Sequence, residues 1–132
     1  MIIDGQGGRI GKALTEALKK LSPDITITAV GTNVMATAAM LKGGADEAAT
    51  GENPVVVCSK TADVIIGPIG IVIANSLLGE VTPKMAEAVG NSDAIRILIP
   101  VEKCNTHVTG VRKMGIEESV QDAVCIVKEL MN

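Results

Sequence analysis

The sequence contains no phenylalanine, tyrosine or tryptophan. No aromatic ring is therefore available to stack on a nucleobase, and such stacking is a main source of affinity for single-stranded nucleic acid. The formal net charge of −3 at pH 7 also lacks the basic excess that proteins use to bind a phosphate backbone. These absences predict an aliphatic core and a protein that does not bind nucleic acid.

Cysteine and histidine are scarce as well. The three cysteines, Cys58, Cys104 and Cys125, form no C-x-x-C pair, and His107 is the one histidine. This pattern predicts neither a disulfide framework nor a zinc ribbon. Cys104 and His107 would face opposite sides of a strand, which argues against a Cys–His nucleophile pair. We expect reduced thiols and no metal, with His107 at the surface and Cys125 packed in the core.

Long apolar runs are absent too. The most apolar stretch, residues 64–78, is interrupted by glycine, proline and asparagine and is too short to cross a bilayer. A glycine-rich segment begins at residue 5, which leaves no room for a signal peptide before it. We therefore expect one cytoplasmic domain, residues 1–132, with no contact with a membrane.

What the chain does contain is an alternation of β-branched runs with segments of helical periodicity. Strands are predicted at residues 1–3, 25–30, 46–50, 62–66 and 95–99, with a further short strand at 107–111. Helices are predicted at residues 12–21, 33–41, 53–61, 71–78, 82–89 and 116–131. The alternation is the pattern of a parallel sheet covered by helices.

The segment 53–61 is compatible with two structures. Its valines, residues 55–57, have strand composition, whereas Asn53 and Pro54 make a good helix start. We favour a helix because the strand predicted at 62–66 needs a crossover before it. The result is an α/β fold: a single-domain, Rossmann-like, doubly wound and mostly parallel sheet of five or six strands, order 3-2-1-4-5(-6), with helices on both faces.

The most informative stretch follows the first strand. It consists of Asp4, Gly5, Gln6, Gly7, Gly8, Arg9, Ile10 and Gly11. A strand, a glycine-rich turn and a helix in that order place unpaired backbone N–H groups and the positive end of a helix dipole at one point, which suits a phosphate. A phosphorylated ligand is therefore expected at this glycine turn, although the glycines could instead serve tight packing between strand and helix.

Further loops are predicted at the same edge of the sheet. Ligands of doubly wound sheets bind beyond the carboxyl ends of the strands, where the winding reverses. The loop residues that we expect there after the second, fourth and fifth strands are Thr32, Asn33, Gly67, Pro68, Ile69, Gly70, Cys104 and Asn105. We expect these loops and the glycine turn to line one cleft.

The glycine spacing bears on the cofactor. Gly5, Gly8 and Gly11 fit G-x-x-G-x-x-G, a variant found among nicotinamide-binding folds, while the standard G-x-G-x-x-G fails because Ile10 stands at its third glycine. The acidic residue that binds the ribose hydroxyls of NAD is expected about 20 positions on, and Gly31-Thr32-Asn33 stands there instead. NAD is therefore disfavoured. NADP or another nucleotide becomes the arguable cofactor, with Thr32 and Asn33 as neutral phosphate ligands.

Three polar side chains have more than one expected role. Arg9 could bind a phosphate through two hydrogen bonds, or be a solvated arginine at a helix start. Asp4 could be a base or a metal ligand, or could cap the glycine turn. Asn75 lies in a segment predicted as an apolar helix, where an unpaired amide costs about 1–3 kcal/mol. We expect it to bind a ligand, the backbone or a second subunit.

Several long strings suggest a family. They are I-D-G-Q-G-G-x-I-G at residues 3–11, G-T-N at 31–33, G-A-D-E-x-A-T-G-E-N at 44–53, A-D-x-I-I-G-P-I-G-I-V-I-A-N-S at 62–76, and I-L-I-P with a following C-N at 97–105. Over nearly its full length the chain resembles a family of short bacterial proteins classed as a domain of unknown function with a Rossmann-like fold. The resemblance implies a cytoplasmic single-domain protein and supplies no activity and no catalytic residues.

Three functions are compatible with these features. We prefer a small module that binds a nucleotide or another phosphorylated ligand at the glycine turn. The first alternative is an NADP-linked oxidoreductase, whose site a dimer or partner would complete because 132 residues leave little room for a substrate domain. The second is a structural or regulatory homo-oligomer without a ligand, in which the apolar segment 69–78 packs against a second copy.

Overall fold

The computed structural model describes residues 1–101 and 105–132. Its five strands form one sheet, and every pair of neighbouring strands is parallel. The strands are β1 (Ile2–Asp4), β2 (Thr28–Gly31), β3 (Glu47–Thr50), β4 (Val64–Pro68) and β5 (Ile95–Ile99). Their order, β3-β2-β1-β4-β5, confirms the predicted doubly wound α/β topology. The predicted sixth strand is wrong, because residues 107–111 are irregular.

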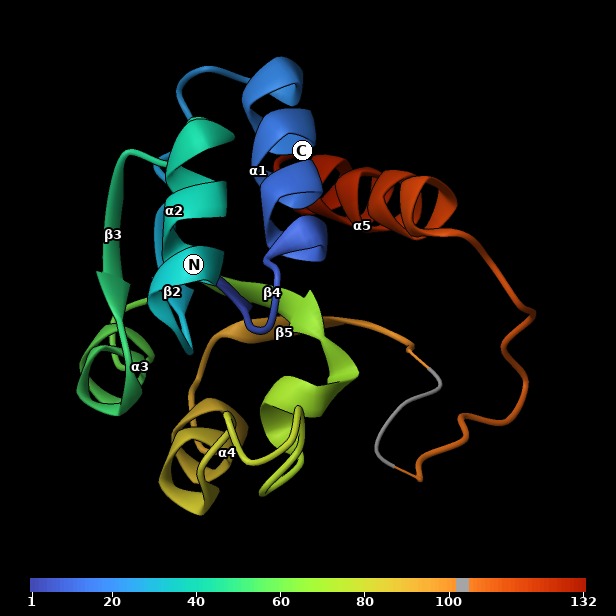
Figure 1. The fold of residues 1–132 in the computed structure, drawn as a ribbon. Helices are drawn as coiled ribbons and strands as arrows, with labels where there is room; N and C mark the ends of the chain where they lie inside the picture. The colour runs from blue at the N-terminus through green and yellow to red at the C-terminus, as the bar shows by residue number, and fades with distance from the viewer. Residues whose placement is uncertain (102–104) are drawn as a thin grey trace.

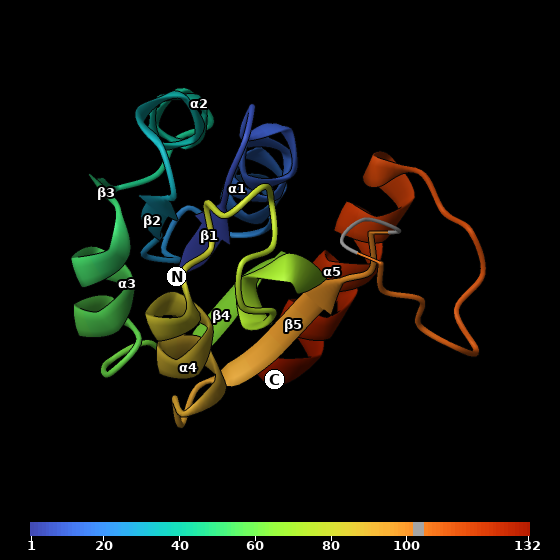
Figure 2. The same ribbon diagram turned by 60° about the horizontal axis from the view of Figure 1, so that its bottom comes forward.

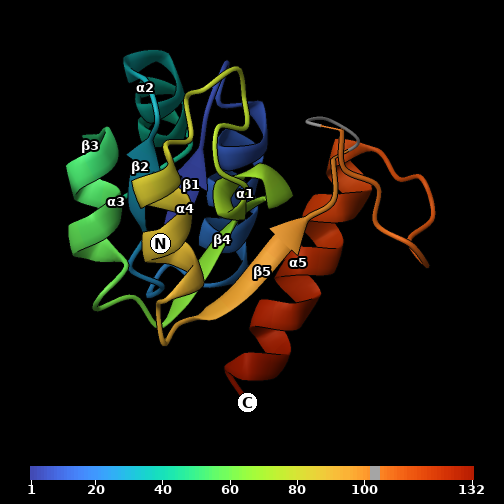
Figure 3. The same ribbon diagram turned by 90° about the horizontal axis from the view of Figure 1, so that it is seen from below.

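Helices cover both faces of the sheet, as Figures 1 and 3 show. They are α1 (Arg9–Leu21), α2 (Val34–Lys42), α3 (Glu52–Cys58), α4 (Pro83–Gly90) and α5 (Ile116–Leu130), with a short 3₁₀ helix, η1 (Ile69–Val72), after β4. α1, α2 and α5 lie on one face, while α3 and α4 lie on the other (Figure 1). Each crossover therefore carries the chain to the next parallel strand on the face that its helix covers.

The core has two layers because successive strand residues point to opposite faces. Ile2 packs with Leu14, Leu18 and Met40 on the face of α1, α2 and α5. Its neighbour Ile3 packs on the other face, in the cluster that contains Val55, Met85 and Val89. Short β1 is thus buried on both faces, which is typical of a central parallel strand.

Capping residues set the starts of two helices as the sequence predicted. The side chain of Asn33 accepts a hydrogen bond from the Ala36 amide at the start of α2. Thr82 accepts from the Met85 amide at the start of α4, and Pro83 follows as the first helical residue. The favoured helix at 53–61 is confirmed as α3, which begins one residue earlier than expected, after Gly51.

Two predictions on the apolar segments are wrong. Residues 71–78 do not form a helix: η1 ends at Val72, and turns follow up to α4. Ile71 and Leu77 are both buried in the cluster beneath α4, which a straight helix leaving β4 would not achieve. Cys125 is exposed, because α5 contacts the core through Val120, Ala123 and Val127, spaced three and four residues apart along one side.

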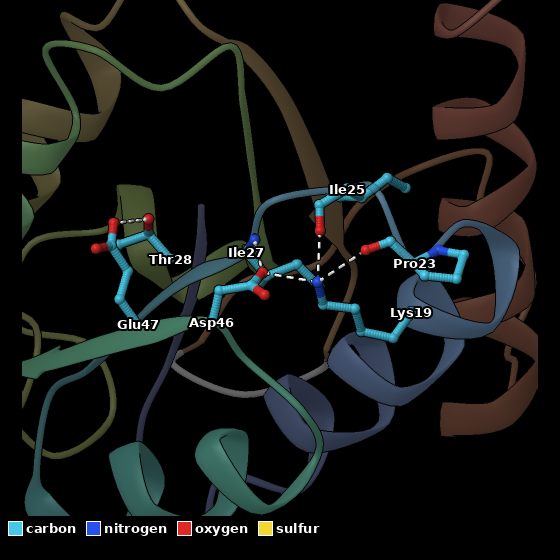
Figure 4. A network of polar contacts seen from close by, with 7 residues as sticks. All are labelled: Lys19, Pro23, Ile25, Ile27, Thr28, Asp46 and Glu47. Carbon is cyan, nitrogen blue, oxygen red and sulfur yellow. Dashed lines mark hydrogen bonds and ion pairs between the residues drawn. The ribbon is translucent and has the colours of Figure 1, made fainter.

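A polar network joins α1 to the start of β2 at the amino-terminal edge of the sheet (Figure 4). Lys19 Nζ donates to the carbonyl oxygen of Ile25 at 2.6 Å and lies 2.7 Å from Asp46 Oδ2. The same carboxylate oxygen accepts from the Ile27 amide at 2.7 Å. The amide of Ile27, followed by Lys19, holds the pKa of Asp46 below its ordinary value. This network fixes the chain between α1 and β2, at the opposite edge from the glycine turn.

Among residues 1–101 and 105–132, no helix has both the length and the apolar composition needed to cross a bilayer.

Candidate functional site

The glycine turn and the loop after β4 meet at one edge of the sheet. β1 and β4 are parallel neighbours with Ile2 opposite Ile66, so Asp4 and Pro68 end at the same edge. A cavity of about 130 Å³ lies between the two corners, lined by residues 4–10 and 68–70 with Leu77, Val101 and Ile116. Ten of the residues expected in the cleft thus line one cavity. They are Asp4, Gly5, Gln6, Gly7, Gly8, Arg9, Ile10, Pro68, Ile69 and Gly70.

Two of the predicted glycines, Gly11 and Gly67, do not line the cavity. A Cβ on Gly11 would lie 2.6 Å from Met40 Sδ of α2, and one on Gly67 would lie 2.3 Å from the carbonyl oxygen of Ile3. Gly67 is therefore required by close approach of the β1 backbone, and Gly11 by packing against the side chains of Met40 and Asp4, whether or not a ligand binds. Gly7 is different, because a Cβ there would meet no atom within 4 Å. Of these three glycines, Gly7 alone borders open space.

Asp4 holds the glycine turn together. This side chain is buried, and its two carboxylate oxygens accept from the amides of Gly5 at 2.8 Å and Gly11 at 2.7 Å. Burial raises the pKa of the Asp4 carboxyl above its ordinary value, although the hydrogen bonds from Gly11 and Gly5 act to lower it. Of the roles that the sequence left open, the capping role is the one that these contacts support.

Most amides of the glycine turn already have acceptors within the chain. The Gly8 amide donates to the Gly5 carbonyl oxygen at 2.9 Å, and the Gln6 amide donates to Glu80 at 2.9 Å. The amides of Gly5 and Gly11 donate to Asp4, so four of the donors that the sequence suggested for a ligand already have acceptors. Gly7 and Arg9 are both exposed and line the cavity, and among the described residues the structure shows no acceptor for their amides. Arg9 is also the cationic side chain in the cavity lining.

Glu80 is the polar residue that sequence reasoning missed. It lies in the loop between η1 and α4, which reaches back to the ends of β1 and β2 (Figure 2). Its Oε1 atom accepts from Thr32 Oγ1 at 2.7 Å and from Asn33 Nδ2 at 2.6 Å, in addition to the Gln6 amide. Burial works to raise the pKa of this carboxyl, but the three hydrogen bonds outweigh it and hold the pKa below its ordinary value.

The position of Glu80 changes the argument about the cofactor. We disfavoured NAD because no acidic residue follows β2 in the sequence, yet a carboxylate lies at the end of β2 in space. Residue 80 is separated from Thr32 by 48 positions, so the local spacing rule for the ribose carboxylate could not have found it. The one signal in the sequence is that Glu80 is the single charged residue between Asp63 and Lys84.

The remaining predicted residues are dispersed. Asn75 is exposed rather than buried in a helix, with a φ of 63° and its amide bonded to the Val81 carbonyl oxygen at 2.7 Å. Its expected burial is therefore wrong, since residues 73–79 turn back on themselves. Asn105 is exposed and borders a shallow depression with Gln6 and Asn75. Cys104 lies outside the described residues. His107 is exposed, as predicted.

A second cavity adjoins the first. It has a volume of about 290 Å³ and shares Ile10, Val101 and Ile116 with the cavity at the glycine turn. Its other walls come from the end of β5 and from the segment that leads into α5, including Arg112 and Lys113. Within the described parts of the chain, no group of three or more histidine, cysteine, aspartate or glutamate residues is placed to hold a metal ion.

Comparison with known proteins gives one match. A family model described as Domain of unknown function (DUF3842) matches residues 1–132. No curated protein and no solved structure matches the chain. The geometry of the site is therefore the basis for any functional argument.

Proposed function

Since the chain belongs to the family described as Domain of unknown function (DUF3842), we propose from its site that it binds a nucleotide or another phosphorylated small molecule. The observation that carries this proposal is the cavity shared by the glycine turn and residues 68–70. It lies beyond the carboxyl ends of β1 and β4, where the winding of the sheet reverses and doubly wound folds bind ligands.

The size of the cavity indicates which part of the ligand it receives. A volume of about 130 Å³ is below the 300–1,000 Å³ or so of pockets that enclose a whole small molecule. It suffices for a phosphate group or a sugar. The adjoining cavity of about 290 Å³ gives room for the rest of the ligand along the edge of β5. We therefore place the phosphate at the glycine turn and the remainder toward Val101 and Ile116.

The donors for that phosphate are few, which limits the affinity. Asp4 already accepts from the amides of Gly5 and Gly11, and its buried carboxyl group lies in the cavity wall. The phosphate is left with the amides of Gly7 and Arg9 and the guanidinium of Arg9. A guanidinium can bind a phosphate through two parallel hydrogen bonds. Arg9 is thus the side chain on which binding depends most.

Isothermal titration calorimetry with ATP, nucleoside monophosphates, NAD and NADP tests the proposal. At least one of these compounds is expected to bind with saturable heat, and Arg9→Gln is expected to weaken it on the order of tenfold. Lys84→Gln, which removes an exposed positive charge from α4, is the matched control and should leave binding unchanged. The absence of heat with every compound at millimolar concentration would exclude the proposal.

The oxidoreductase alternative requires a rearrangement at the same edge of the sheet before NADP could bind. Thr32 and Asn33, expected to bind the additional phosphate of NADP, both donate to Glu80. A 2′-phosphate can reach them only if the Glu80 carboxylate moves away. Assays with reduced cofactor and a range of aldehydes and ketones test this alternative, and no consumption of cofactor would leave it without support.

The oligomeric alternative was based on an apolar helix at residues 69–78, and this helix does not form. The segment 69–78 was expected to be an apolar helix facing a second copy, but Ile71 and Leu77 are buried within the same chain. Leu78 is the large apolar residue of this segment that projects into solvent, at 96% exposure. A homo-oligomer stays a prediction, and light scattering across a concentration series tests it.

A further inference from the structure

We propose that the Gln6 amide, the Thr32 hydroxyl and the Asn33 side-chain amide form an anion site. In this structure the Glu80 carboxylate occupies the position that an anionic group of the ligand would take. We call residues 73–82, which carry Glu80, the latch, and infer that a bound ligand displaces it. The inference rests on the proposed function and adds the regulation of the same site. The site takes one phosphate or carboxylate group.

Three donors converge on a single oxygen. Glu80 Oε1 lies 2.9 Å from the Gln6 amide nitrogen, 2.7 Å from Thr32 Oγ1 and 2.6 Å from Asn33 Nδ2. The donors come from two loops, after β1 and after β2, whereas the acceptor arrives from a third. Asn33 Nδ2 also donates to the Gln6 carbonyl oxygen at 3.0 Å, which orients it without Glu80. The Asn33 donor is therefore held by a contact that does not require the latch.

The donor set is suited to a phosphate oxygen as well as to a carboxylate. Backbone amides, hydroxyls and side-chain amides are the usual neutral donors to phosphate groups, and hydrogen bonds to an ionised acceptor are shorter and stronger than neutral ones. Among the described residues, no lysine or arginine forms an ion pair with Glu80. The carboxylate is held by hydrogen bonds alone, which a ligand anion can replace one for one.

The latch covers part of the glycine turn. A Cβ on Gly5 would lie 2.7 Å from Leu77 Cδ1 and 3.1 Å from Glu80 Oε1. Gly5 is buried, although it opens the glycine turn. While Glu80 is in place, its carboxylate occupies the Gln6 amide and the side-chain donors of Thr32 and Asn33, so a ligand anion cannot bind them. Release of the latch would make these three donors available beside the cavity, which Gln6 lines.

The latch is also strained. Asn75, Leu77 and Leu78 have φ values of 63°, 55° and 58°, in the left-handed region that L residues other than glycine rarely adopt. A residue in that region persists only where its surroundings hold it there. Leu78 gains no burial in return, because it projects into solvent. The strain favours the released state, whereas the hydrogen bonds of Glu80 and the burial of Leu77 and Val81 in the core oppose it.

The test compares the full chain with Glu80→Gln and Glu80→Ala, using inorganic pyrophosphate and ADP as probes and adenosine as the uncharged control. Each variant weakens the internal acceptor, so a larger fraction of the protein is open and the apparent dissociation constant falls accordingly. We expect pyrophosphate and ADP to bind on the order of tenfold more tightly, with no change for adenosine. Glu87→Gln, which removes an equal charge from the exposed side of α4, controls for net charge.

The outcomes separate this inference from the proposed function. If the wild type binds ADP and the Glu80 variants bind it equally, Glu80 is a structural tie and the inference is wrong. Weaker binding by the variants would mean that Glu80 contacts the ligand itself, for example a ribose, and would also overturn it. If no probe binds to any of the proteins, the proposed function fails together with the inference.

A second measurement follows the latch directly. Hydrogen exchange of amides in residues 73–82 is expected to accelerate when pyrophosphate saturates the wild type, since the latch leaves its site. Glu80→Gln conserves the shape of the side chain and one acceptor oxygen, so this variant serves even if Glu80→Ala does not fold. Slower exchange in this segment on addition of pyrophosphate would contradict release.

Discussion

Glu80 and Asn33 lie 47 positions apart in the sequence and are joined by a hydrogen bond of 2.6 Å from Nδ2 to Oε1. Asn33 has two tasks, because its Oδ1 atom accepts from the Ala36 amide and caps α2. One side chain thus fixes the start of a helix and the position of the 73–82 loop. The two tasks can be separated by substitution.

Asn33→Asp is expected to lower the free energy of unfolding by about 1–2 kcal/mol. Aspartate retains the helix cap but replaces the donor to Glu80 by a second carboxylate, so two like charges face each other. Asn33→Ser also retains a cap and removes the donor without adding charge, and should cost less. Urea unfolding of the three proteins measures the difference, and equal stability of the two variants would contradict the role of charge.

Asp4→Ala is expected to lower the free energy of unfolding by several kcal/mol. It removes the acceptor of the buried amides of Gly5 and Gly11, and each unsatisfied buried group costs about 1–3 kcal/mol. Thermal and urea unfolding at pH 7 measure the loss. Thr32→Ala, which removes one hydroxyl at the half-buried edge, is the milder comparison and should cost about 1 kcal/mol.

The titration of Asp4 is also expected to affect how the free energy of unfolding depends on pH. Its pKa in the folded protein is raised above 3.8, so the native state binds the proton more readily than the unfolded chain. Its contribution to stability therefore rises as the pH falls from above the folded pKa toward 3.8. Asp4→Asn, which cannot titrate, is expected to lack this contribution. A difference between wild type and variant that is independent of pH would contradict the assignment.

Asp46 is expected to show the opposite trend. Its pKa is lowered in the folded protein by the Ile27 amide and by Lys19, so its contribution is present above the ordinary value of 3.8 and is lost as the pH falls through the lower folded pKa. Asp46→Asn should reduce stability at pH 7 and should differ less from wild type at acidic pH. Thermal unfolding between pH 7 and pH 2 measures both. Lys19→Met should reproduce part of the effect, because it removes the partner 2.7 Å away.

Leu78→Asn is expected to raise the free energy of unfolding by up to about 1 kcal/mol, because asparagine adopts the left-handed region at lower cost than leucine. Little burial is lost, since Leu78 is 96% exposed. If residues 73–82 act as a latch, the same change should weaken ADP binding a few-fold by favouring the closed state. Leu78→Ala removes the apolar side chain without relieving the strain, and should leave both properties close to wild type.

The sequence by itself determined five strands, five helices and their order, but not the structure of residues 71–78 and 107–111. The β-branched run at 95–99, the Asn33 and Thr82 caps and the spacing of Val120, Ala123 and Val127 act within a few residues, and each led to the strand or helix that is observed. The parallel order then follows, because short crossovers of fixed hand leave few topologies. Strand order in turn brings the glycine turn and residues 68–70 to one edge.

Only the tertiary structure decided which acceptor pairs with the polar donors of the site. The acceptor of the Gln6 amide lies 74 positions away in the sequence, and no periodicity or spacing connects the two residues. Residues 71–78 are as apolar as a buried helix, yet burial of Ile71 and Leu77 beneath α4 bends them into turns and carries Glu80 to the end of β2. Local patterns specify what a segment prefers. Which donor meets which acceptor is decided by the packing of segments that are distant in the chain, because a buried polar group accepts whichever partner the fold brings within reach.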